Sequence, residues 1–158
     1  MAATLATDQI WQAFLGRFDE SKTFFHGHTY GGNPLAAAVA IASLDVFDEE
    51  KTLAKVASRS QQLRDHLERI RNHPQVGDIR QHGLIAGIEL VRDKGTKEPY
   101  PWTDRRGQRV CDFARSKGVW LRPLGNVVVI MPPLAIAADE LDIICHAVAE
   151  GIDDATVG

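Results

Sequence analysis

The chain has 158 residues, enough for one domain that buries about two-thirds of its unfolded surface. Its formal net charge of −3 and pI near 6.0 give no basic surface of the kind that binds nucleic acid. It has neither an apolar run long enough to cross a membrane nor a charged-then-apolar leader for secretion, so we expect a cytoplasmic protein. Cys111 and Cys145 fall in predicted helices with apolar neighbours, which favours reduced core residues over a disulfide or a metal pair.

The first predicted element is a short helix at residues 8–15, for which Thr7 is a suitable N-cap. Residues 16–32 form a long loop, and a loop of this length favours a functional or interface segment over a simple connection. The loop ends in residues 25–34, of sequence FHGHTYGGNP, which contain three glycines and two hydroxyl side chains.

A long apolar helix follows this run. Asn33 is a good N-cap, and Pro34 suits the first helical position, where its missing N–H costs nothing. Residues 35–47 contain no glycine or proline and are apolar on most sides, which predicts a buried helix. Glycines beside a helix N-terminus favour a phosphate site with unpaired N–H groups, but an ordinary glycine-rich turn before a buried helix is an equally good reading of the spacing.

The second half of the sequence alternates helices and strands. A stripe of apolar residues between Leu53 and Ile70 predicts an amphipathic helix, and residues 77–81 and 84–91 predict two strands joined at His82 and Gly83. Residues 92–102 are a polar loop. The remaining predictions are a helix at 104–117 that ends at Gly118, strands at 119–122 and 126–131 around a turn at 123–125, and a final helix whose apolar stripe comprises Leu141, Ile144, Cys145, Val148 and Ile152.

This order of elements predicts a small α+β sandwich, with helices on one face of a mostly antiparallel sheet. His26 and His28 alternate as in some metal sites, but no acidic or thiol partner stands at a convincing spacing, and we expect no metal. His66 and His146 are expected to be ordinary surface or boundary residues.

Several strings of residues together resemble one family. His26-Gly27-His28-Thr29-Tyr30 followed by Gly-Asn-Pro-Leu-Ala resembles the signature of class III aminotransferases, which depend on pyridoxal 5'-phosphate. The likeness continues in the same order through residues 76–80, 97–101, 121–125 and 131–134, and so covers essentially the whole chain. Within the family the chain is similar to the biotin-pathway branch.

The resemblance implies roles for four residues. Thr29, with the backbone at His28, would bind the cofactor phosphate across the interface of a homodimer, and Gly27 would lie against the substrate. Arg122 would pair with the carboxylate of 7-keto-8-aminopelargonate, for which S-adenosylmethionine is the usual amino donor. Without the resemblance, Arg122 could be a solvated surface arginine at the end of a strand. The apolar, turn-like residues on either side of it favour a side chain with a fixed position. Some members carry proline at the position of His28, so its imidazole has no assigned role, and Tyr30 either stacks near the cofactor or packs.

The Schiff-base lysine of these enzymes is absent from the chain. It must be partly desolvated, or otherwise lowered in pKa, to act as a nucleophile and base. The six lysines fall in polar loops, at a helix end or on a charged helix face: Lys22, Lys51, Lys55, Lys94, Lys97 and Lys117. In the family the reactive lysine lies shortly before the stretch that matches residues 1–5, so we expect a C-terminal fragment that is inactive by itself.

The resemblance also implies a division of the chain, with the architecture of a fold-type I pyridoxal-phosphate-dependent transferase. Residues 1–32 would end the large domain and form the cofactor-phosphate and dimer-interface loop, residues 33–72 would be linking helices, and residues 73–158 would be the small C-terminal domain. Standing alone, the chain would expose apolar residues of the first two helices. The alternatives are a fragment of another class III transaminase acting on an ω-amino acid or amine, and a non-catalytic interaction module.

Overall fold

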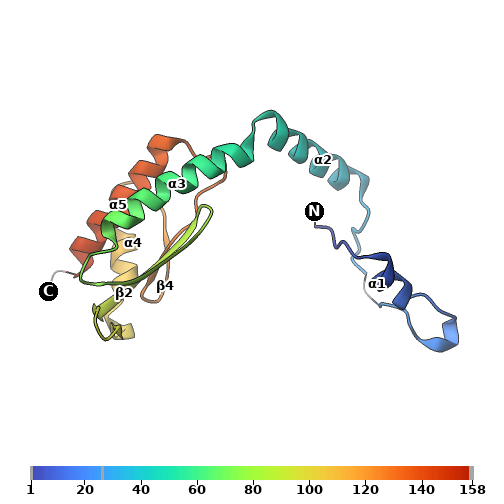
Figure 1. The fold of residues 1–158 in the computed structure, drawn as a ribbon, viewed down its shortest axis with the longest axis horizontal. Coiled ribbons are helices and arrows are strands. Elements are labelled where there is room, and N and C mark those ends of the chain that lie inside the picture. The colour runs from blue at the N-terminus through green and yellow to red at the C-terminus, as the bar shows by residue number, and fades with distance from the viewer. Residues whose placement is uncertain (1, 26, 157–158) are drawn as a thin grey trace. The chain divides into compact units, whose positions relative to one another are not determined.

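The structure, a computed structural model, describes residues 2–25 and 27–156, and it divides into two compact units (Figure 1), Met1–Glu50 and Lys51–Gly158. The first unit contains helix α1 (Asp8–Ala13), a 3-10 helix (Phe18–Glu20) and helix α2 (Pro34–Glu49). The second contains helices α3 (Thr52–Ile70), α4 (Arg106–Ser116) and α5 (Ala138–Thr156), a 3-10 helix (Trp102–Asp104) and a five-stranded sheet. No helix in the described part of the chain is both long and apolar enough to cross a membrane.

Both helices of the first unit begin at the predicted caps. The Thr7 hydroxyl accepts a hydrogen bond from the N–H of Ile10, and the Asn33 side chain accepts from the N–H groups of Leu35 and Ala36 at 2.9 and 3.2 Å. Helix α1 ends at Ala13, two residues before the predicted end.

Most large apolar side chains of α1 and α2 are exposed, whereas Phe47 is half-buried. No residue of either helix is buried, so the prediction of a buried helix at 35–47 is not met within this chain. The exposure predicted for the chain standing alone is confirmed for Ile10, Trp11, Phe14, Leu35, Val39, Ile41, Leu44 and Val46. An apolar helix without a covering partner indicates a surface that other protein covers.

The sheet of the second unit is antiparallel throughout. Its strands are β1 (Val76–His82), β2 (Ile85–Asp93), β5 (Val127–Ile130) and β4 (Arg122–Leu124) in that spatial order, and the short β3 (Glu98–Pro99) pairs with the end of β2. The prediction of an α+β fold with helices on a mostly antiparallel sheet is confirmed.

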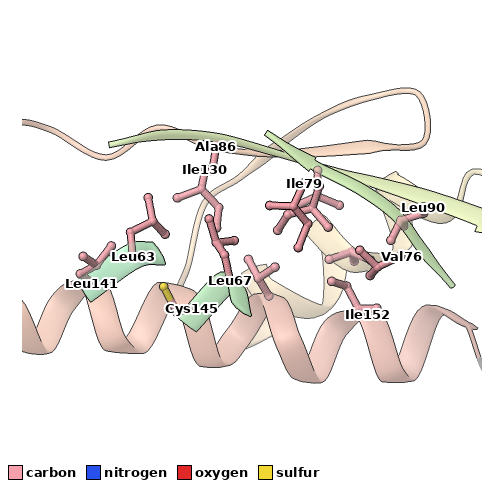
Figure 2. Packing of buried hydrophobic residues seen from close by; sticks show 14 of the residues in the cluster. Leu63, Leu67, Val76, Ile79, Ala86, Leu90, Ile130, Leu141, Cys145 and Ile152 are labelled. Atoms are coloured by element: carbon pink, nitrogen blue, oxygen red, sulfur yellow. The ribbon is translucent and has the colours of Figure 1, made fainter. Parts of the chain in front are cut away.

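The hydrophobic core lies between this sheet and its helices. Alternate residues of the central strand β2, Ala86, Ile88 and Leu90, are buried, as the period of two in a strand requires. They belong to one buried cluster with Leu63 of α3 and Leu141 of α5, both fully buried, and Figure 2 shows these two leucines between the helices and the sheet. The helices therefore cover one face of the sheet, and the residues between these positions on each strand lie on the opposite face.

The structure differs from the local sequence predictions at β3 and β4 and agrees with them at the end of α4. The predicted loop at 92–102 contains strand β3, which is only two residues long and has no hydrophobic pattern to reveal it. The predicted strand at 119–122 is wrong, because β4 begins at Arg122 and contains Pro123; the turn lies at Gly125 and Asn126. The predicted glycine C-cap of α4 is confirmed, since Gly118 has φ +83° and the Val119 N–H bonds to the Ala114 carbonyl.

The two faces of β2 provide a stability test with a matched control. Ile88→Ala removes a fully buried side chain at the centre of the sheet, so we expect the free energy of unfolding to fall by about 2–5 kcal/mol. Ile85→Ala, on the same strand but 51% exposed, should cost much less. Urea unfolding followed by circular dichroism measures both, and equal losses would contradict the assignment of the core face.

Candidate functional site

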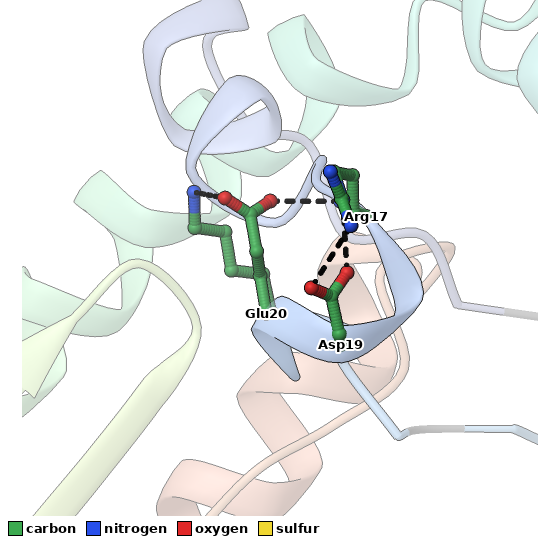
Figure 3. A network of polar contacts seen from close by, with 4 residues as sticks. Arg17, Asp19 and Glu20 are labelled. Carbon is green, nitrogen blue, oxygen red and sulfur yellow. Dashed lines mark hydrogen bonds and ion pairs between the residues drawn. The ribbon is translucent and has the colours of Figure 1, made fainter.

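The loop that precedes the glycine-rich run is held by charged side chains (Figure 3). The Arg17 guanidinium contacts the Asp19 carboxylate at 3.0 Å, and the backbone N–H of Arg17 donates to Glu20 Oε2 at 2.8 Å. Lys22 lies 3.6 Å from the other oxygen of Glu20. These contacts shape the 3-10 turn, and because all four side chains are open to solvent the ion pairs contribute little to stability.

The glycine-rich run forms two successive turns before α2. The Gly31 N–H donates to the His28 carbonyl at 2.9 Å, and the Asn33 N–H donates to the Tyr30 carbonyl at 3.2 Å. Gly32 has φ +72°, a conformation that side-chain-bearing residues rarely adopt. A methyl group at Gly31 would lie 3.2 Å from the His28 carbonyl oxygen, so the first turn is tight at that point. His26 lies outside the described residues.

The start of α2 is not an open anion site. Pro34 has no N–H, the N–H groups of Leu35 and Ala36 bond to the Asn33 side chain, and the Ala37 N–H bonds to the Asn33 carbonyl. The expectation of unpaired N–H groups at this helix N-terminus is therefore wrong, because Asn33 satisfies them. Donors for a phosphate have to come from the loop.

The loop has the donors that a phosphate requires. Thr29 is exposed, and its hydroxyl has no hydrogen-bond partner among the described residues. Gly27 has no atom within 4 Å of the position that a side chain would occupy, which leaves room for a bound group beside the backbone. His28 and Tyr30 are also exposed. Hydroxyl and backbone N–H donors on small residues suit the oxygen atoms of a phosphate, so these residues fit the phosphate group of the cofactor that the sequence implies.

Arg122 belongs to the second unit, where it opens strand β4. Register places it beside Val129, which lies beside Gly87, on the face of the sheet opposite the core. Arg122 is exposed and borders a mainly apolar groove of about 490 Å³, whose other lining residues include Trp120, Leu124, Val129, Met131 and Pro133. A guanidinium at the rim of an apolar groove is suited to a carboxylate that carries a hydrocarbon chain.

The structure thus groups the predicted residues into two sets. Gly27, His28 and Thr29 share one loop of the first unit, and Arg122 lies in the second unit. Arg80 was missed by the sequence analysis; it pairs in register with Gly87 and contacts Glu89 at 3.5 Å on the same sheet face as Arg122. Only strand register reveals that relation, although the alternation of apolar and polar residues along each strand is visible in the sequence.

The groove residues Trp120 and Met131 were also missed. Both are large and apolar, and their side chains are 79% and 68% exposed. Trp120 lies two residues before β4, which begins with Arg122, and Met131 directly follows β5. The signal in the sequence was their position on either side of the short β4–β5 hairpin.

The lysine side chains are all exposed in the described structure. Lys22 pairs with Glu20, Lys117 lies 3.2 Å from Glu150, and Lys94 donates to the Arg71 and His73 carbonyls. A lysine that acts as nucleophile and base needs partial desolvation or a neighbouring cation. None of these settings provides it.

A second polar cluster joins α3 to α5. Asp142 accepts from Gln62 at 2.7 Å and lies 2.6 Å from His66 Nε2, and these hydrogen bonds hold the pKa of its carboxyl below the usual range. The His146 ring lies edge-on to that of His66. The cluster cross-links two helices of the core, and no group of three or more His, Cys, Asp or Glu side chains in the described residues is placed to hold a metal ion.

Burial makes both cysteines poor nucleophiles. It raises the pKa of the Cys111 thiol to about 11 and that of Cys145 to about 12. Neither forms a disulfide, and both are buried. Since the thiolate is the reactive form, we assign them to packing.

Comparison with known proteins adds to this picture. The sequence model of the family described as "Aminotransferase class-III" matches residues 1–152 of the chain. The chain is similar to the adenosylmethionine-8-amino-7-oxononanoate aminotransferase of Geobacter sulfurreducens, with 52% identity over all 158 residues, which cover 35% of that protein. It is 43% identical to the enzyme of the same name from Methanocaldococcus jannaschii, over 98% of this chain and 34% of the relative.

Solved structures agree. The crystal structure of the Methanocaldococcus jannaschii enzyme superposes with a TM-score of 0.87 at 41% identity, over 96% of this chain and 34% of that one. A thermostable omega transaminase from Pseudomonas jessenii gives a TM-score of 0.78 at 36% identity, over 87% of this chain and 31% of that one. The chain therefore spans about a third of the length of the relatives it matches.

Proposed function

Because this chain belongs to the class III aminotransferases, we propose that it is the C-terminal part of an enzyme that transfers an amino group to 7-keto-8-aminopelargonate in biotin biosynthesis. The amino donor is S-adenosylmethionine, the cofactor is pyridoxal 5'-phosphate, and the enzyme works as a cytoplasmic homodimer. Identity of 52% along the whole chain to a relative named for this reaction supports the proposal. The observation that carries it in the structure is Arg122 beside an apolar groove.

The chemistry of the substrate matches that groove. 7-Keto-8-aminopelargonate has a carboxylate at one end of a nine-carbon chain and its reacting keto group near the other end. Arg122 binds the carboxylate through its planar guanidinium, and Trp120, Leu124 and Met131 provide apolar contacts for the methylene groups. Binding at the remote end orients the keto group without touching it, which lowers the entropic part of the barrier.

The loop of the first unit holds the cofactor phosphate. The Thr29 hydroxyl and the backbone at His28 donate hydrogen bonds to it, and Gly27 leaves space against which the substrate lies. When bound, pyridoxal phosphate supplies an electron-accepting ring and an aldehyde for amino-group chemistry. The exposed apolar residues of α1 and α2 provide the surface that the rest of the dimer covers.

The proposed domain division follows the same reasoning. Residues 1–32 complete the large domain and its cofactor loop, residues 33–72 link the parts, and residues 73–158 form the small domain. In the structure α2 groups with the first unit, whereas α3 packs on the sheet of the second through Leu63 and Leu67. A fragment of another class III transaminase, or a module that lost catalysis, would lack the activity tested below.

The proposal is tested in a chimera. The 158 residues replace the matching C-terminal third of the Geobacter sulfurreducens relative, which supplies the remainder of the enzyme. We expect the chimera to convert 7-keto-8-aminopelargonate with S-adenosylmethionine as donor, and the chain alone to show no turnover because its lysines are all exposed. A folded chimera that uses only an ω-amino acid or a simple amine would point to another class III transaminase, and one with no transaminase activity would point to a non-catalytic module.

Arg122→Ala in the chimera should weaken binding of the keto acid by about 2–5 kcal/mol, because a carboxylate taken out of water would lose its charged partner. Substrate affinity from steady-state kinetics measures the effect. Arg64→Ala, which removes an exposed arginine of α3, is the control and should leave affinity unchanged. Equal affinity in the Arg122 variant and the parent would remove the carboxylate role.

Thr29→Ala should weaken cofactor retention by about 1–3 kcal/mol through loss of one hydrogen bond to a charged phosphate. Thr29→Ser keeps the hydroxyl and should retain most of the affinity. Spectroscopic titration of the chimera with pyridoxal phosphate gives the dissociation constants, and identical values for the parent and the alanine variant would count against a phosphate contact.

A further inference from the structure

The hairpin that carries Arg122 has little sheet to hold it. Strand β4 is three residues long and lies at the end of the strand order β1-β2-β5-β4, so within the described part of the chain it pairs with β5 alone. A short edge strand of this kind is readily displaced. The position of Arg122 therefore depends on contacts at the turn between β4 and β5.

Asn126 fixes that turn from two directions. Its side-chain amide donates to the Tyr100 carbonyl at 2.8 Å, and its own carbonyl accepts from the Leu90 N–H at 2.9 Å. Tyr100 is itself buried, and the guanidinium carbon of Arg106 lies over the Tyr100 ring, 4.9 Å from the ring centre. The turn is thus tied to a residue that does not move independently of the core.

Trp102 covers the turn. Gly125 has φ +61°, and a methyl group at that position would overlap the edge of the Trp102 ring, with Cη2 and Cε3 at 3.2 and 3.3 Å. The indole lies directly against the backbone, yet Trp102 is 77% exposed. A large exposed aromatic side chain that contacts a glycine backbone has little role in the core.

Helix α4 closes the other side. A methyl group at Gly107 would overlap the Gly125 carbonyl oxygen and would lie 3.2 Å from Cβ of Pro123. The backbone of α4 therefore touches both the turn and the residue after Arg122. Trp102, Asn126 and Gly107 together surround the hairpin at its closed end.

We infer that Trp102 and Asn126 are positioning residues that set the place of the β4–β5 hairpin, and so of the Arg122 guanidinium, for a carboxylate-bearing substrate. The inference rests on the proposed role of Arg122. The segment from Tyr100 to Gly107 fixes the end of the hairpin, and Arg122 lies three residues from the Gly125 backbone that Trp102 covers.

The test uses Trp102→Ala in the chimera, since the exposure of this side chain lets the variant fold. The probes are nonanoate and its neutral analogue nonanamide, used as competitive inhibitors. We expect the preference for nonanoate over nonanamide to fall three- to tenfold, and the KM for the keto acid to rise by a similar factor with kcat nearly unchanged. Trp102→Phe, which keeps a ring over Gly125, should restore the preference to within twofold, and Asn126→Ala should act in the same direction as Trp102→Ala.

Two controls make the outcomes decisive. Ile143→Ala removes an exposed apolar side chain of α5 and should leave the inhibitor preference unchanged. Arg122→Ala defines the preference that remains without the guanidinium. If Arg122→Ala lowers the preference and Trp102→Ala does not, the positioning role is overturned while the proposed function stands; if Arg122→Ala has no effect, the carboxylate role falls and the inference falls with it.

A second measurement uses the 158-residue chain itself. Hydrogen exchange of peptides covering residues 122–130 should accelerate at least tenfold in Trp102→Ala, while peptides from α5 keep the protection of the parent. Unchanged exchange in the hairpin would overturn the inference, as would a loss of protection that is uniform across the second unit, since that would assign Trp102 to overall stability.

Discussion

The packing of one face of an antiparallel sheet against α3 and α5 is the constraint on which the second unit depends. Strand β2 lies between β1 and β5 and contributes Ile88, which is fully inaccessible to solvent. Each of the two helices contributes a fully buried leucine to the same core, Leu63 from α3 and Leu141 from α5. Because side chains alternate along a strand, burial of this face commits the other face to a different use. That opposite face carries Arg80, Gly87, Val129 and Arg122 in one row across the sheet. The candidate substrate contacts are therefore a geometric result of how the core is formed.

The first unit follows the opposite rule. Its helices have good caps and good helix-forming sequences, yet they bury nothing. Local signals such as Thr7 and Asn33 are enough to define where helices begin, but they do not supply a core. A segment of this kind is stable in its working form when it packs against protein outside the unit, which agrees with relatives about three times as long as the chain.

Much of the fold could be predicted from the sequence because its signals are local. The stripe on α5, the alternation along β2 and the glycine that ends α4 can each be recognised within a window of a few to some ten residues. Strand β4 could not be placed, since Pro123 reads as a turn residue and becomes a strand residue only because an edge strand tolerates a missing donor. The relation of Arg80 to Arg122 depends on the pairing of strands that are far apart in the sequence. Residue spacing does not express that pairing.

The Asn33 cap has a consequence for ligand binding at the loop before α2. A helix N-terminus with unpaired N–H groups is a ready site for an anion, because these groups and the helix dipole both favour negative charge. Here an amide oxygen already occupies the end of α2, at 2.9 Å from the Leu35 nitrogen. The first turn of α2 is therefore capped by its own chain, and the hydrogen bonds of that cap do not depend on a ligand. A phosphate bound at the preceding loop would gain no hydrogen bond from the N–H groups of Leu35 and Ala36, and its loss would leave the cap of α2 intact.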